Sequence, residues 1–362
     1  MKINNSSMHT IDLSDILNMD LGNVVEYRRF QSGLLHDINV AIKTETCYLC
    51  GNKCTSYCNS HTIPAFCLRY IAENGKLLNC NSIFDSTYQN QEDGVNKAGT
   101  FHLICKKCDN ETFKDYEDEN NYFNELTDIM LAQIALKDVL KAIWGKMREM
   151  EMLLKLSKQI QSEIIQRKYE DHIATMELLQ KDYNFAVNAL SHPNKKRYAL
   201  QLLITLPYKV PIAYQGAIEL FCDLSGNVIN NIYNKDSIEN NQSLHLAILP
   251  FKESSVILMF VEENKKKKKY KQFFHQLRKL SEPEQLAVIN YIVFTYTDDY
   301  FISPTISDDV LIGLKNMASK SVDIISPNSI GLSSATKILC DSFSFVHRFE
   351  IENLLHEKYK IK

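Results

Sequence analysis

Two C-x2-C pairs constrain this chain more than any other feature of its sequence. They are Cys47/Cys50 and Cys105/Cys108, and 54 residues separate the first pair from the second. The two-residue spacer lets both sulfurs of a pair reach one metal ion, and a structural zinc takes four such ligands in a tetrahedron. The two pairs therefore predict one structural Zn²⁺ held by all four thiolates.

The distribution of the cysteines agrees with metal binding. Eight of the ten lie between residues 47 and 108, and the long remainder of the chain holds Cys222 and Cys340. A disulfide scaffold is short and rich in cysteine throughout, so metal ligation in a reducing compartment explains this distribution better. For the irregularly spaced Cys67 and Cys80 we expect packing as small apolar side chains.

Length and charge define the class of protein. A chain of 362 residues has room for two or three domains, and an apolar content of 45% allows sizeable cores. The net charge of −3 gives no general attraction to nucleic acid or acidic lipid, so a nucleic-acid surface has to be a local basic patch. The N-terminus lacks a signal-peptide core, and the apolar run 256–261 is far shorter than the roughly 20 residues that cross a bilayer. We expect a soluble, cytoplasmic protein without a membrane partner.

The hydrophobic pattern predicts an α+β fold in four parts. Residues 1–44 are a weakly patterned lead-in, 45–125 the zinc-binding module, 126–192 a long helical arm or hairpin, and 193–362 a C-terminal α+β domain. In that last domain an antiparallel sheet comes first and helices follow. The expected strands are 200–206, 213–224, 244–249 and 256–261, and the expected helices are 270–280, 282–296, 308–318 and 333–357.

The stretch 127–190 has apolar residues at helical spacing, with Thr127 and Asp128 as candidate N-caps. A coiled-coil arm and a helical hairpin both fit this pattern. The apolar face is then buried either in a homodimer or within one chain, and the pattern does not separate these two arrangements.

The cysteine-rich module resembles the zinc-stapled HNH, or ββα-metal, nuclease family over residues 45–120. The resemblance rests on the order of a C-x2-C pair, His61 followed by Pro64, an asparagine-bearing loop and a second C-x2-C pair. It implies a ββα-type module with a structural zinc. It also implies that His61 is the general base that activates water beside a catalytic Mg²⁺ or Mn²⁺ ion.

The resemblance further implies an orienting asparagine and an oxygen ligand for the catalytic ion. We take Asn81 for the first role and Asp109, directly after Cys108, for the second. Carboxylate oxygens are the ligands that Mg²⁺ prefers, although a solvated acidic helix start is an equally consistent interpretation of this segment. The alternative candidates for the two roles are Asn79, Asn96, Asp115 and Glu117.

The chain departs from the family pattern on both sides of this site. Ser60 precedes His61, where family members often carry an acid or a histidine, and the next histidine after Cys108 is His172. His102 alternates with apolar neighbours and is expected to face outward from a short strand.

His61 itself has two further interpretations. It is either a ligand of a second zinc ion together with Cys54 and Cys58, or a histidine packed inside the module. Because an imidazole titrates near neutral pH, the role of general base also fits its chemistry.

Two functions follow from these observations. The first is an HNH-type metal-dependent nuclease that hydrolyses phosphodiester bonds in nucleic acid, with DNA as the expected substrate and bacterial defence against foreign DNA as the expected setting. The alternative is a non-catalytic zinc-binding adaptor for nucleic acid or protein. Basic residues at Arg69, at Lys106 and Lys107, and in the run 265–269 are suited to phosphate contacts, and the run also fits a solvated loop.

Overall fold

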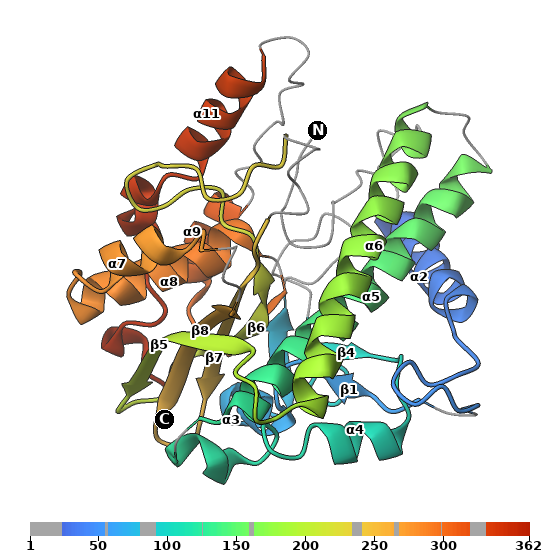
Figure 1. The fold of residues 1–362 in the computed structure, drawn as a ribbon, viewed down its shortest axis with the longest axis horizontal. Helices are drawn as coiled ribbons and strands as arrows, with labels where there is room; N and C mark the ends of the chain where they lie inside the picture. The colour runs from blue at the N-terminus through green and yellow to red at the C-terminus, as the bar shows by residue number, and fades with distance from the viewer. Residues whose placement is uncertain are drawn as a thin grey trace.

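The computed structural model describes residues 24–54, 57–79, 92–124, 126–158, 163–233, 241–263, 268–297, 299–318 and 331–362. Helices pack on both sides of an antiparallel sheet (Figure 1), which confirms the predicted α+β class. The N-terminal helix α2 spans Val24–Ala41 and lies beside the helical hairpin.

The main sheet has the strand order β3-β2-β9-β6-β7-β8-β5 in the described part of the chain, and every neighbouring pair is antiparallel. The four predicted strands are present, but the second, predicted to run to residue 224, ends at Ile218. β7 and β8 form a tight hairpin because Phe251 N–H donates to Ser254 C=O at 2.8 Å. The C-terminal strands are β5 (Tyr198–Leu206), β6 (Ile212–Ile218), β7 (Leu244–Pro250), β8 (Ser255–Glu262) and β9 (Tyr300–Ile302).

The edge of this sheet comes from the cysteine-rich module. β2 (Lys76–Asn79) and β3 (Glu92–Gly94) form a hairpin, and β2 also pairs with β9, with Leu78 opposite Ile302. The sheet thus runs across the boundaries expected near residues 125 and 192. The four-part division stays a prediction, but its second and fourth parts share one sheet.

A smaller sheet lies within the module. β1 (Ser60–His61) pairs with β4 (Thr100–Phe101), so that two strands are followed by helix α4 (Lys106–Thr112). Helix α3 (Ala65–Ile71) begins directly after Pro64 and buries Phe66, Leu68 and Ile71.

Two long helices, α5 (Asp128–Ser157) and α6 (Glu163–Ser191), pack side by side as a hairpin (Figure 1). Thr127 caps α5, because its Oγ1 accepts the Met130 N–H at 3.2 Å. The two helices therefore pack on each other within one chain, and a homodimer through these helices stays a prediction.

The two faces of the sheet contact different cores. Alternate residues of β7, such as Leu246 and Ile248, pack with the C-terminal helices, whereas Ala247 and Leu249 pack with α5 and the module. All seven residues of β7 are buried, as expected for a central strand covered on both sides. The C-terminal helices are α7 (Lys271–Leu277), α8 (Glu282–Tyr296), α9 (Asp308–Ala318) and α11 (Leu332–Ser342).

One buried carboxylate joins α5 to the sheet. One oxygen of Asp138 accepts a hydrogen bond at 3.0 Å from Nε2 of Gln215, a residue of β6. Its second oxygen lies 2.7 Å from Nδ1 of His245, a residue of β7. The Asp138 side chain has no exposed surface. The charge is tolerated there because both oxygens have polar partners.

We expect Asp138→Ala to destabilise the fold by about 2–4 kcal/mol, because it leaves Gln215 and His245 buried without their partner. Urea unfolding monitored by circular dichroism measures this change. The control is Glu170→Ala on the exposed face of α6, which should change stability by less than about 0.5 kcal/mol. Equal stabilities of the two variants would contradict a structural role for Asp138.

Candidate metal centre

The two C-x2-C pairs meet in space. The four sulfurs of Cys47, Cys50, Cys105 and Cys108 all lie within 4.8 Å of one another. The first pair sits in the turn that follows α2, where Gly51 takes a left-handed conformation (φ +69°) and donates its N–H to Cys47 C=O at 2.8 Å. A residue with a β-carbon is disfavoured in that conformation, which accounts for a glycine directly after the pair.

The second pair opens helix α4. Cys105 occupies the N-cap, and Cys108 lies in the first turn with its N–H directed at Cys105 Sγ at 3.5 Å. The Cys105 N–H also points at Cys47 Sγ, at 3.3 Å. Backbone amides thus face the sulfurs of both pairs, as they do where thiolates bind a metal.

The environment of Cys47 favours the thiolate. Burial alone would raise the pKa of its thiol. Hydrogen bonds from the backbone amides of Cys105, Cys50 and Leu49 together outweigh this effect and lower the pKa to about 7. A thiolate is the form that ligates metal. Four sulfur donors at this spacing fit a tetrahedral site for a metal such as Zn²⁺, and they are the four residues of the predicted ligand set.

The first pair is also tied to α6. Tyr48 donates its hydroxyl to Gln180 Oε1 at 2.7 Å, and Tyr183 donates its own to Tyr48 C=O at 2.9 Å. The two tyrosine rings meet edge to face at 5.0 Å. These contacts connect the first C-x2-C pair directly to helix α6 of the hairpin.

His61 ends β1 and is partly buried. Its Nε2 lies 2.9 Å from Val95 C=O. Because a carbonyl only accepts hydrogen bonds, Nε2 carries the proton and Nδ1 is left as the basic nitrogen. Burial lowers the pKa of His61, and the nearby positive charge of Lys137 lowers it further, so the ring is neutral at neutral pH.

A second zinc site does not form in the described residues. Cys54, Cys58 and His61 are not gathered into a cluster of metal-binding atoms there. Burial, followed by the negative charge of Asp109, raises the pKa of the Cys58 thiol to about 12. Cys58 instead donates its S–H to Ile104 C=O at 3.4 Å.

Asp109 belongs to a buried polar network. Its Oδ1 accepts a hydrogen bond from Ser60 Oγ at 2.6 Å and another from Lys137 Nζ at 2.7 Å. The same ammonium lies 2.8 Å from Ser60 Oγ and 3.0 Å from Glu117 Oε1. Three oxygens, from β1, α4 and the segment after α4, therefore converge on one positive charge.

This positive charge is fully enclosed. The Lys137 side chain has no exposed surface, and its Nζ lies 4.2 Å from the centre of the Phe113 ring. Burial alone would raise the pKa of Asp109. The charge and hydrogen bond of Lys137 outweigh this effect and lower the pKa, so Asp109 is ionised at neutral pH. For Glu117 burial is the larger effect, and its pKa is raised.

The remaining sequence candidates fall in different places. Asn81 lies outside the described residues. Asn79 donates its side-chain amide to Asp93 within the β2–β3 hairpin, and Asp115 accepts a hydrogen bond from Gln133 at 2.7 Å. His102 is exposed, as predicted, and its ring meets Trp144 edge to face.

Lys137 is the residue that sequence reasoning missed. It stands with Asp138 inside the largely apolar stretch from Met130 to Leu140, where every residue of α5 is buried. A lysine next to an aspartate in such a stretch is a signal for buried charge pairing, because isolated charges are rarely buried.

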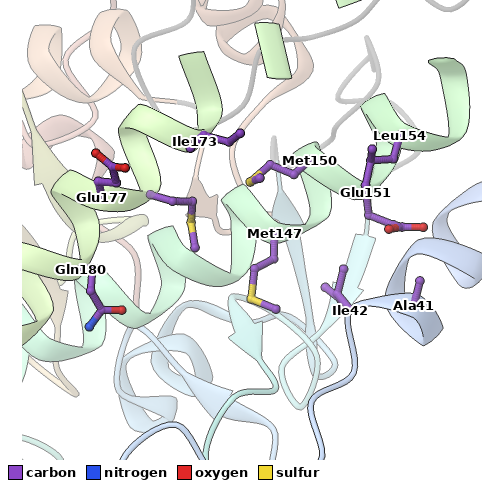
Figure 2. A pocket seen from close by; sticks show the side chains of 10 residues that line it. Ala41, Ile42, Met147, Met150, Glu151, Leu154, Ile173, Glu177 and Gln180 are labelled. Atoms are coloured by element: carbon purple, nitrogen blue, oxygen red, sulfur yellow. The ribbon is translucent and has the colours of Figure 1, made fainter. Parts of the chain in front are cut away.

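A groove adjoins the metal centre on the helical side. It has a volume of about 550 Å³ and lies between the end of α2 and the facing sides of α5 and α6 (Figure 2). Gln180, which binds Tyr48 of the first C-x2-C pair, lies at this groove as well. The lining residues are Ala41, Ile42, Met147, Met150, Glu151, Leu154, Ile173, Met176, Glu177 and Gln180.

No family model, curated protein or solved structure matches this chain. The HNH resemblance thus remains an interpretation of motif and spacing. Among the described helices, none combines the length and apolar character that a bilayer crossing needs.

We expect purified protein to contain about one zinc ion per chain by elemental analysis. Cys108→Ser should lose this zinc and lower the melting temperature, because three thiolates no longer complete the tetrahedron. Cys67→Ala removes a buried thiol outside the cluster and should retain the metal despite some loss of stability. Zinc content that Cys108→Ser leaves unchanged would exclude this site.

Proposed function

We propose that the chain is a zinc-stabilised, non-catalytic binding protein whose HNH-like site holds a lysine ammonium in place of a divalent ion. The observation that carries this proposal is the position of Lys137 Nζ, within 3.0 Å of oxygens of Ser60, Asp109 and Glu117. Ser60 precedes His61 and Asp109 follows Cys108, which are the positions where the family resemblance puts ligands of the catalytic ion.

A divalent ion and this ammonium compete for the same oxygens. Two positive charges a few ångströms apart repel strongly in a buried site, where water screens little. Lys137 cannot simply move aside into solvent, because its side chain has no exposed surface and comes from the middle of α5. Binding of Mg²⁺ or Mn²⁺ would therefore require either loss of the lysine proton or rearrangement of the helix.

The four-cysteine site supports a structural role for its metal. Four protein ligands complete the tetrahedron of a zinc ion and leave no position for a reactive water. The metal would join the turn after α2 to the start of α4, and Tyr48 would connect that junction to α6. We infer that zinc is the resident ion and that it organises the module.

The surface that this arrangement supports best for binding is the groove along α5 and α6. The groove is largely apolar and rich in methionine, with Met147 and Met150 visible in Figure 2 and Met176 as a further lining residue. Leu154 and Ile173 are substantially exposed. Methionine side chains adapt to different apolar surfaces. These features favour a protein partner over nucleic acid at this face.

Removal of the ammonium tests the proposal. Lys137→Met should destabilise the protein by about 3–5 kcal/mol, because Asp109 and Glu117 then face each other without a cation. Mn²⁺ should raise the melting temperature of this variant by several degrees and leave wild type unchanged. Lys155→Met, at a position of the same helix that reaches solvent, is the control and should respond like wild type. Mn²⁺ binding to wild type that Asp109→Asn abolishes would contradict the proposal.

A second candidate is the HNH-type nuclease, which the geometry of His61 favours. The Val95 carbonyl fixes the Nε2 proton and leaves Nδ1 free to take a proton from water, and the lowered pKa keeps the ring in the basic form. The proposed substrate is then DNA, with Mg²⁺ or Mn²⁺ as the catalytic ion and defence against foreign DNA in a bacterium as the setting.

Nuclease activity is measured directly by incubating the zinc-loaded protein with plasmid, linear and single-stranded DNA and with RNA, in Mg²⁺ or Mn²⁺. The binding-protein proposal expects no cleavage by wild type or by His61→Ala. Cleavage that His61→Ala reduces by about 100-fold or more, a typical contribution of a general base, would instead establish the nuclease.

A further inference from the structure

Two buried thiols lie far from the metal centre in the C-terminal half of the protein. Cys222 follows β6 and forms a backbone bridge with Val228, and Cys340 lies in the last turn of α11. Cys222 has no exposed surface and Cys340 is 5% exposed. Both are free cysteines, although their positions in the chain are 118 residues apart.

The two cysteines approach each other reciprocally. Cys222 Sγ lies 3.7 Å from Cys340 C=O, and Cys340 Sγ lies 4.0 Å from the carbonyl of Phe221, the neighbour of Cys222. Cys222 Sγ also lies 3.8 Å from Phe343 C=O, just beyond the end of α11. Each sulfur therefore lies beside the backbone of the segment that carries the other cysteine. This proximity is what a disulfide, with its S–S distance of about 2.05 Å, requires of the two backbones.

Aromatic packing holds this pair in place. The rings of Phe221 and Phe343 meet edge to face at 4.8 Å, and the Tyr296 ring lies 4.8 Å from Phe343. These contacts press the end of α11, the red helix in Figure 1, against the segment after β6. The same packing prevents the cysteines from separating widely while α11 remains folded.

The two thiols differ in acidity. The interaction with Cys222 lowers the pKa of Cys340, and the interaction with Cys340 raises the pKa of Cys222. Cys340 is also the more exposed of the two. Both differences favour Cys340 as the sulfur that reacts first, with Cys222 as the resolving partner.

We propose that Cys222 and Cys340 form a redox modification site, which a small hydroperoxide converts into an intramolecular disulfide. The Cys340 thiolate attacks one peroxide oxygen and breaks the O–O bond, giving a sulfenic acid and, for hydrogen peroxide, one water after protonation. The Cys222 sulfur then attacks the sulfenic sulfur, forms the S–S bond and releases a second water. Two thiols are oxidised by two electrons, and one peroxide is reduced.

The disulfide would fix α11 to the end of β6. It closes a loop of more than one hundred residues, and a cross-link over so long a loop restricts the unfolded chain strongly. Oxidation should therefore stabilise the C-terminal domain and leave the four zinc-binding thiols free to hold their metal.

The test uses full-length, zinc-loaded protein treated with a small excess of hydrogen peroxide. Peptide mapping without reduction should find a peptide pair linked through Cys222 and Cys340 as the main intramolecular cross-link. The melting temperature should rise by roughly 3–6 °C and return after reduction. Elemental analysis follows the zinc in the same samples.

Cys340→Ser and Cys222→Ser distinguish the site from general oxidation. Both variants should lose the cross-link and the temperature shift, and Cys340→Ser should also lose the sulfenic acid that Cys222→Ser still forms. If a variant is too unstable to purify, wild type alone decides. Two outcomes would overturn the proposal. In one, Cys222 and Cys340 both stay free while other cysteines of the same sample are oxidised. In the other, either of them forms its disulfide with a different cysteine.

Discussion

The positive charge of Lys137 is the interaction on which the arrangement around α5 depends. Ser60 is 77 residues away in the chain, yet its hydroxyl and the carboxylates of Asp109 and Glu117 all meet one ammonium. The next residue, Asp138, bonds to the main sheet instead, through Gln215 and His245. One turn of a single helix thus sets the position of the module relative to the sheet.

Buried charge is costly, and it is stable here because each charge has several partners. Such networks specify one arrangement, since slight displacement leaves a charge uncompensated. The four-cysteine cluster at the start of α4 follows the same principle, since its four sulfurs are placed to share one metal ion. The small sheet of the module has only two residues in β1 and two in β4, and these two clusters lie on either side of its connection to α4.

The regular elements could be predicted because their signals are local. The apolar runs of β5 to β8, the Thr127 cap of α5 and the Glu282-Pro283-Glu284 start of α8 are all visible in short windows of sequence. The four-cysteine cluster was predictable for a chemical reason, since two thiols with a two-residue spacer are suited to share one metal ion. The three-residue strand β9 and its pairing with β2 were not, because they depend on residues more than 200 positions apart. Lys137 escaped because helical periodicity describes which face is buried and says nothing of which buried residue carries charge.

The pairing of β2 with β9 also has a consequence for the order in which the chain becomes structured. During synthesis the four cysteines emerge within the first third of the chain, so the metal can assemble the knuckles early. Leu78 and Asn79 can pair with Ile302 and Phe301 only after those residues have been synthesised, and only then does the main sheet gain its outer strands. Until that late stage the hairpin presents unpaired backbone groups, which are a template for pairing with another chain. Ribosome-bound and truncated forms that end before residue 300 are therefore the species most prone to aggregate.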